Sequence, residues 1–220
     1  MPSIIVFHSD AEPIRTREPD GFLHVEQHPI SEVTDFDVIG QPEPGVAYVR
    51  HPVSPRRLLP LATYHPTLLV EKANEAALMM TYLGASHIEL SCTSRLCDQA
   101  RAEIEILFGL VTLGGNKDTN EEGVVLYRAQ GEGSAPRTLP TLTWIKEPTW
   151  EAIVQGRLHS GLRECSTSFT YDHSSGVDAD LAAKVKRCGF TLGGEYRKSH
   201  RIAFNLSGTF PASVPTSAAA

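Results

Sequence analysis

Histidine is the side chain through which this sequence could most readily perform acid–base or metal chemistry. The 220 residues contain nine histidines, of which the first 65 residues hold five: His8, His24, His28, His51 and His65. Imidazole exchanges protons near neutral pH and ligates metals, so these rings could form a site together with Asp10, Asp35 or Asp37. His24 and His28 lie in a proline-rich stretch that is unsuited to a metalloprotease helix. His51 and His65 each precede a proline at the expected end of an element, and we take them as the candidate catalytic residues.

Cysteine offers a second candidate metal site. Cys92 and Cys97 have a C-x4-C spacing that resembles a zinc knuckle. Cys165 and Cys188 are too far apart in sequence to supply a second knuckle. Thiols on apolar faces are commonly small buried hydrophobic groups. We therefore predict neither a metal nor a cofactor, and keep Cys92 and Cys97 as the candidate ligands.

Motifs for nucleophilic or phosphate chemistry are incomplete. The sequence has no Gly-x-Ser-x-Gly elbow and no Ser-x-x-Lys motif. The stretch 109–119 resembles a P-loop, but Asn116 precedes Lys117 where the loop requires glycine, and Asp118 follows where it requires Ser or Thr. These motifs resemble no protein family as a set. The absence of a catalytic constellation favours a non-enzymatic role.

Charge and hydropathy exclude several classes of protein. The formal net charge is −6, which argues against general nucleic-acid binding. Residues 1–136 carry 10 basic and 19 acidic side chains and residues 137–220 carry 10 and 7, an asymmetry that favours head-to-tail or intramolecular contacts. No apolar run reaches the roughly 20 residues of a membrane-spanning helix, and the start lacks a signal peptide. Together with the four cysteines, this predicts a cytoplasmic protein with free thiols.

The first 63 residues are predicted to form a proline-rich arm. Nine of the chain's 15 prolines lie in its first 60 residues, which disfavours long helices. Alternation and flanking turn residues predict strands at Ile4–His8 and 46–50, with weaker strand candidates at 22–25 and 33–39. We expect this arm to pack on the rest of the chain.

The remainder reads as the same order of elements twice. Helical periodicity at 66–83 is followed by strand alternation at 87–92 and 123–130, and a second series has a helix from Pro148, a strand at 163–171, a helix at 178–188 and a strand at 196–206. The tetrapeptide Thr-Leu-Gly-Gly occurs at 112–115 and at 191–194. This order predicts an internal duplication. The segment 98–108 fits both templates; it is a helix if the duplication holds and a strand otherwise.

These elements predict an α+β fold, with a two-layer α/β arrangement as the variant. Two αβαβ-like units, at 64–136 and 137–210, would form a mixed sheet packed by helices, after the arm at 1–63. The small residues at 211–220 predict a frayed tail.

The leading functional hypothesis is a non-enzymatic intracellular protein that acts by protein–protein association or self-assembly, with exposed edge strands as contact surfaces. The basic residues Arg197, Lys198 and Arg201 on the last strand are its candidate contacts. One alternative is a membrane-active effector that inserts amphipathic β-strands. A second is a small His-dependent hydrolase or metal enzyme. Local nucleic-acid binding stays open through a basic set: Lys184, Lys186, Arg187, Arg197, Lys198 and Arg201.

Overall fold

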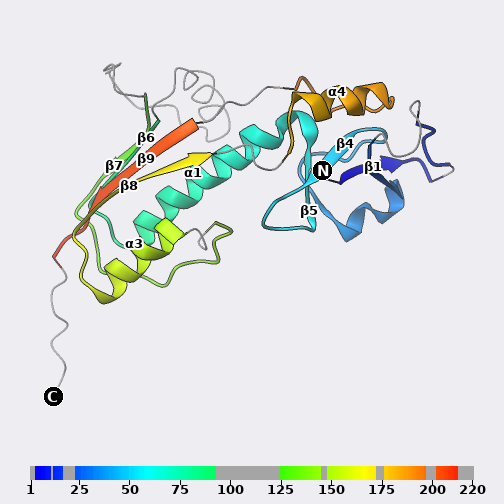
Figure 1. The fold of residues 1–220 in the computed structure, drawn as a ribbon. Coiled ribbons are helices and arrows are strands. Elements are labelled where there is room, and N and C mark those ends of the chain that lie inside the picture. Colours follow the sequence, from blue (N-terminus) through cyan, green and yellow to red (C-terminus); the bar gives the residue numbers. More distant parts are fainter. Residues whose placement is uncertain are drawn as a thin grey trace. The chain divides into compact units, whose positions relative to one another are not determined.

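The computed structural model describes residues 3–10, 12–16, 23–92, 124–144, 148–171, 176–196 and 202–212. The chain divides into two compact units, each discontinuous in sequence. Unit 1 comprises residues 1–68 and 172–200, and unit 2 comprises residues 69–171 and 201–220. Each unit contains one sheet with associated helices, so the predicted α+β fold class is confirmed (Figure 1).

Unit 1 is built on a five-stranded mixed sheet in the order β2-β1-β4-β5-β3. Its strands are β1 (Ile4–His8), β2 (Val25–Pro29), β3 (Asp37–Val38), β4 (Ala47–Arg50) and β5 (Arg57–Pro60). The pairs β1–β2 and β3–β5 are parallel, whereas β1–β4 and β4–β5 are antiparallel. The prolines at the ends of β2 and β5 help to keep these strands short, because proline donates no ladder hydrogen bond.

One face of this sheet holds a small aromatic and aliphatic core. Phe7 packs edge-on against Phe36 and Tyr48, with ring centroids 5.9 and 5.7 Å apart. The short 3-10 helix η1 (Ile30–Asp35) contributes Ile30 and Val33 to the same cluster. A second 3-10 helix, η2 (Leu61–Thr63), leads into α1 (Tyr64–Tyr82).

Helix α4 (Ala179–Arg187) also belongs to unit 1 and follows directly from its sequence. The Asp178 carboxylate accepts a hydrogen bond of 2.8 Å from the Leu181 amide, which caps the helix. Leu181 and Val185 are buried, as the spacing predicts. The chain then returns to the sheet, where the Ala47 amide donates to the Thr191 carbonyl at 2.9 Å.

Two strand predictions in the arm are wrong in detail, and one strand was missed. The strand expected over 33–39 is 3-10 helix through Asp35, because Val33 and Ile30 turn onto the Phe7 cluster, and only Asp37–Val38 is extended. The strand expected at 22–25 begins at Val25 and continues to Pro29. Strand β5 was not predicted, since a four-residue run ending in proline carries little periodic signal.

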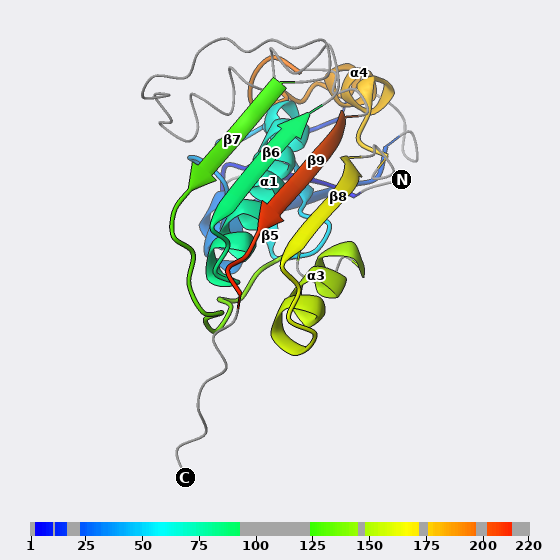
Figure 2. The same cartoon turned by 90° about the vertical axis from the view of Figure 1, so that its left-hand side faces the viewer.

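Unit 2 is built on a four-stranded sheet in the order β7-β6-β9-β8, all neighbours antiparallel. The strands are β6 (His87–Cys92), β7 (Val124–Gln130), β8 (Glu164–Tyr171) and β9 (Ile202–Thr209). Strand β9 therefore lies between β6 and β8, and strands β7 and β8 form the two edges (Figure 2). The last strand was predicted over 196–206; Tyr196 is not extended in the sheet, residues 197–201 lie outside the described residues, and the described strand runs over Ile202–Thr209.

Helices α1, from Leu69 onward, and α3 (Pro148–His159) lie on the same side of this sheet (Figure 1). The Trp150 ring on α3 meets Phe169 on β8 edge-on at 5.6 Å, and Phe169 stacks on Phe204 of β9 at 5.1 Å. Gly84 lies two residues after the end of α1 and has a φ of 81°, which is accessible to glycine. A Cβ on Gly84 would overlap the Ser134 carbonyl oxygen, so the close approach of the segment after β7 also requires glycine.

The predicted helices at 66–83, from Pro148 and at 178–188, and the strands at 87–92, 123–130 and 163–171, are confirmed to within about two residues. The segment 98–108, on which the duplication hypothesis turned, and the first Thr-Leu-Gly-Gly at 112–115 lie outside the described residues. In the described ranges, no helix is both long and apolar enough to cross a membrane.

Candidate functional site

The two candidate catalytic histidines are buried and hold backbone in place. His51 is 1% exposed, and its Nδ1 accepts hydrogen bonds from the Val53 and Ser54 amides at 3.2 and 3.1 Å. His65 is also 1% exposed, and its Nε2 lies within hydrogen-bonding distance of the Val177 carbonyl. His51 thus organises the turn between β4 and β5, and His65 fixes the start of α1 against the segment before α4.

The other residues singled out from the sequence fall largely outside the described structure. Cys97, Arg197, Lys198 and Arg201 lie outside the described residues, and Cys92 is described only through its backbone in β6. Neither Cys165 nor Cys188 forms a disulfide. Burial raises the pKa of the Cys165 thiol, with an opposing contribution from the Gly208 backbone, so this sulfur is protonated and a poor nucleophile at neutral pH.

The structure assembles one polar cluster that spacing did not reveal, at the rim of the unit 1 core. Glu26 on β2 accepts hydrogen bonds from the Ser3 hydroxyl and from Arg50 Nη2, the latter at 2.9 Å. Ser3 Oγ also lies 3.2 Å from His24 Nδ1. His28 lies between two carboxylates, with Nδ1 3.1 Å from Glu32 and Nε2 4.0 Å from Glu26. We call Ser3, His24, Glu26, His28, Glu32 and Arg50 the Glu26 cluster.

The electrostatics of the Glu26 cluster favour a structural role, in which Glu26 holds its hydrogen-bond partners, over proton transfer. The Ser3 hydroxyl and, secondarily, Arg50 lower the pKa of Glu26, although partial burial opposes this shift. A carboxylate that is stabilised in its charged form is a weak general base, so it activates the Ser3 hydroxyl poorly. Arg50 is also engaged by the Pro55 carbonyl at 3.0 Å and lies over the Phe36 ring. The cluster therefore ties the ends of β1, β2 and β4 together.

Metal chemistry finds no support in the described part of the chain, where no group of three or more His, Cys, Asp or Glu side chains is arranged to hold an ion. In the Glu26 cluster, the guanidinium of Arg50 occupies the carboxylate that a cation would need.

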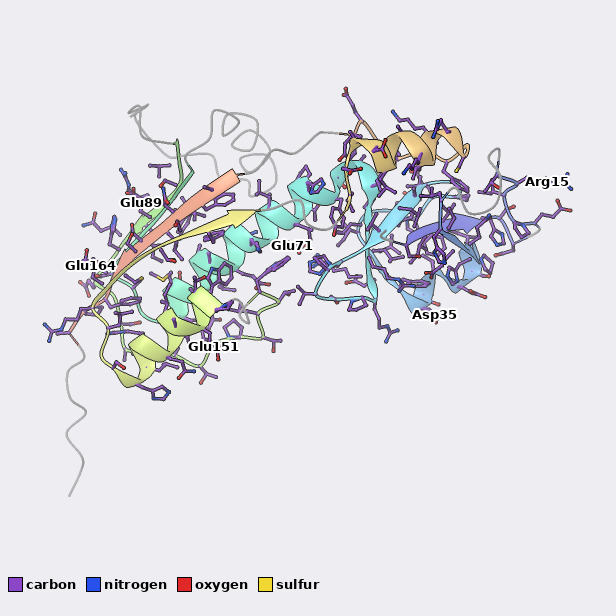
Figure 3. The ribbon with its side chains drawn as sticks, in the orientation of Figure 1. Arg15, Asp35, Glu71, Glu89, Glu151 and Glu164 are labelled. Atoms are coloured by element: carbon purple, nitrogen blue, oxygen red, sulfur yellow. The ribbon has the colours of Figure 1, made fainter. Side chains whose placement is uncertain are left out.

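The face of the unit 2 sheet away from α1 and α3 is polar and rich in hydroxyl groups. In Figure 3, Glu89 and Glu164 lie on this face. The strand registers align the residues of this face in rows that cross β6, β9 and β8. With the two glutamates, the face comprises His87, Glu89, Ser91, Asn205, Ser207, Thr209, Glu164, Ser166 and Ser168. Among these residues there is no Phe, Tyr or Trp that could stack on a nucleic-acid base, and Arg128 of β7 is paired with Glu89 at 2.9 Å.

Strand β8 presents backbone hydrogen-bonding groups at the edge of this sheet. The Phe210 amide donates to the Arg163 carbonyl at 2.8 Å, so residue 163 directs its backbone toward β9. Antiparallel strands alternate this direction with every residue, so residues 165, 167 and 169 also bond to β9. The N–H and C=O groups of the even-numbered residues, Glu164, Ser166, Ser168 and Thr170, therefore point away from β9, to the side of β8 on which the described residues place no strand.

The β8 edge carries few of the features that protect natural edge strands. It has eight residues, no proline and no basic residue, and its pairing with β9 has no register shift. Charged residues, proline, bulges and short length are the usual protection. The opposite edge strand, β7, contains Arg128, and its pairing with β6 shifts register at Leu90/Ser91. The side chains of Ser166 and Ser168 are exposed.

Comparison with known proteins gives no independent assignment of this site. No family model matches the chain, and no curated protein or solved structure is significantly similar to it.

Proposed function

We propose that this is a non-enzymatic intracellular protein that acts by association, and that β8 is the strand through which it pairs with another chain. The observation that carries this proposal is the outward direction of the backbone groups of Glu164, Ser166, Ser168 and Thr170 at an unprotected edge. An added strand satisfies such groups directly, and this pairing is a recurring mode of recognition. Cys165 and Cys188 are outside disulfides, which suits a reducing compartment.

The arrangement of strands within unit 2 also supports association at this edge. Helix α1 precedes the antiparallel pair β6–β7, and helix α3 precedes the antiparallel pair β8–β9. Under the duplication hypothesis, β8 is thus the counterpart of β6. On its side away from β7, β6 binds β9 as an antiparallel neighbour. The open edge of β8 is the counterpart of that occupied edge.

Ser166→Pro tests the role of this edge with little disturbance to the fold. The Ser166 amide points away from β9, so proline removes an edge donor and leaves the β8–β9 ladder intact. The matched control is Ser166→Ala, which removes the hydroxyl but keeps the amide. We expect Ser166→Pro to weaken association about tenfold or more, since about 1.4 kcal/mol changes a dissociation constant tenfold.

Association is measured for the full chain, by sedimentation for self-association and by quantitative pull-down for other chains. Circular dichroism and thermal unfolding establish that both variants keep the fold. Equal binding by folded Ser166→Pro and Ser166→Ala would show that β8 is not the contact strand, and so would the absence of any binding by the wild-type chain.

A further inference from the structure

The proposed function leaves open which strand pairs with β8. Resting on that function, we propose that the occupant is β8 of a second copy of this chain. The two strands run antiparallel about a two-fold axis, with Thr167 of one copy opposite Thr167 of the other. The two four-stranded sheets then form one continuous sheet of eight strands.

The direction of the backbone groups restricts the register of such a pair. In a continuous antiparallel sheet, residues directly opposite each other share a face, so each residue of β8 must face one of the same parity. The axis therefore passes through a residue position. Because the even-numbered residues point outward, even residues form the hydrogen-bonded pairs and odd residues form the closer pairs without hydrogen bonds.

Strand length then selects between the two central registers. With the axis at Thr167, Glu164 faces Thr170 and Ser166 faces Ser168, so all four outward residues are paired in both copies. With the axis at Ser168, the position opposite Glu164 lies past the end of β8 at Tyr171. The register centred on Thr167 forms more hydrogen bonds within the strand and is the one we assign.

Charge also favours a second copy as the occupant. Glu164 is the one charged residue of β8, and it lies at the end of the strand. Antiparallel self-pairing therefore keeps the two Glu164 side chains at opposite ends, and no like charges face each other. Ser166 and Ser168, which are exposed on the hydroxyl-rich face, become cross-strand neighbours, and paired hydroxyl residues stabilise antiparallel sheets.

A charge-swap pair tests this register directly. In the assigned register, Ser166→Lys/Ser168→Lys places lysine opposite lysine on both sides of the axis. Ser166→Lys/Ser168→Glu places lysine opposite glutamate instead. Since these side chains lie on the open face, both variants should keep the monomer fold. We expect the Lys/Lys variant to weaken dimerisation about tenfold or more, and the Lys/Glu variant to stay within about threefold of the wild type.

Cysteine cross-linking gives a second readout, using Cys165→Ser as background so that the nearby native thiol does not react. Thr167→Cys should form a disulfide-linked dimer, because opposing residues without hydrogen bonds bring their Cβ atoms close. Ser168→Cys is the matched control and should link much less. Preferential linking through Ser168→Cys would overturn the assigned register.

The two proposals fail in different ways. If the wild-type chain is monomeric by sedimentation at its highest soluble concentration, the second copy is not the occupant. A different partner that binds Ser166→Ala but not Ser166→Pro would then still support association through β8. Equal weakening of dimerisation by the Lys/Lys and Lys/Glu variants would reject the symmetric pair. An assembly whose mass keeps increasing with protein concentration, beyond that of a dimer, would also reject it and would indicate head-to-tail pairing of β8 with β7.

Discussion

The sheets of the two units differ in the length and regularity of their edge strands. In unit 1 the edge strands are β2, which ends in Pro29, and β3, which has two residues. In unit 2 the strands have six to eight residues, and the edge strand β8 is regular along its length. Proline and short length disfavour pairing with a further strand. This contrast is the reason for which we propose β8, and not an edge of unit 1, as the strand that pairs with another chain.

The same contrast extends to how each sheet is held together. Unit 1 adds side-chain hydrogen bonds at the rim of its core, above all those of Glu26 with Ser3 and Arg50. Unit 2 packs an aromatic layer that includes Trp150, Phe169 and Phe204 between its sheet and helices. Truncation of this layer should therefore destabilise unit 2, whereas protonation of Glu26 should affect unit 1.

The largest expected effect is loss of the aromatic stack in unit 2. Phe204 is fully buried and stacks on Phe169, so Phe204→Ala should destabilise the protein by about 3–5 kcal/mol. Phe204→Leu keeps most of the volume and should cost clearly less. Chemical denaturation, with hydrogen exchange of the β6 and β9 amides, measures both. A cost near zero for Phe204→Ala would refute the dependence of unit 2 on this layer.

A second large effect is expected at the end of α1. Gly84→Ala combines a φ of 81° with an overlap between Cβ and the Ser134 carbonyl oxygen, so about 2–4 kcal/mol should be lost. Gly131→Ala is the control, since a Cβ there meets no atom within 4 Å. Thermal unfolding of the two variants gives the comparison. Similar stabilities would show that the segment after β7 can move away from α1 at little cost.

The buried guanidinium in unit 2 should give an intermediate effect. Arg157 is 3% exposed, donates to the Leu83 and Leu162 carbonyls at 3.2 and 3.1 Å, and lies over the Phe210 ring. Arg157→Met leaves both carbonyls without this donor and should cost about 1–3 kcal/mol. Urea unfolding measures it against Arg163→Met, an exposed site. A more stable Arg157→Met variant would show that desolvation of the charge, which lowers the pKa of Arg157, outweighs these bonds.

The smallest expected effect is the pH-dependent stabilisation of unit 1 by Glu26. The pKa of Glu26 is lowered in the folded state, so its contribution is present above the unfolded-state value of about 4.3 and is lost as pH falls through the folded value. Glu26→Gln should cost under about 1 kcal/mol at pH 7, because the site is partly exposed. The difference from wild type should shrink below about pH 4. Hydrogen exchange of the β1 and β2 amides, recorded as a function of pH, measures this stability difference. Glu12→Gln, at an exposed site, is the control.

Periodicity predicted most of unit 2 and less of unit 1. The apolar spacing from Leu69 to Leu83 and the alternation in β6 and β8 carry enough repeats to define α1 and both strands. In unit 1, Arg57–Pro60 is too short for alternation to be informative, and Ile30 and Val33 form 3-10 helix because the Phe7 cluster provides a place to bury them. Tertiary contacts decide structure where local patterns are brief.

The candidate sites were harder to predict than the elements. Three members of the Glu26 cluster, Ser3, Glu26 and Arg50, are more than 20 positions apart in sequence, and the pairing of β1 with β2 and β4 brings them together. The abundance of histidine near the start of the chain was the available signal for a polar cluster. His24 and His28 belong to that cluster, whereas His51 and His65 are buried and contact backbone groups. Edge strands were predicted as contact surfaces, but the identity of the edge depends on the insertion of β9 between β6 and β8.

That insertion also has a consequence for synthesis. The ribosome completes β6, β7 and β8 before it reaches β9, which supplies the central pairing to both β6 and β8. Until Ile202–Thr209 emerges, the pair β6–β7 and the strand β8 have no strand that joins them, and the stacking partner of Phe169 is missing. The sheet of unit 2 can therefore form only after β9 has left the ribosome. Nascent chains that stall before this point expose apolar surface and strand edges of the kind that chaperones bind.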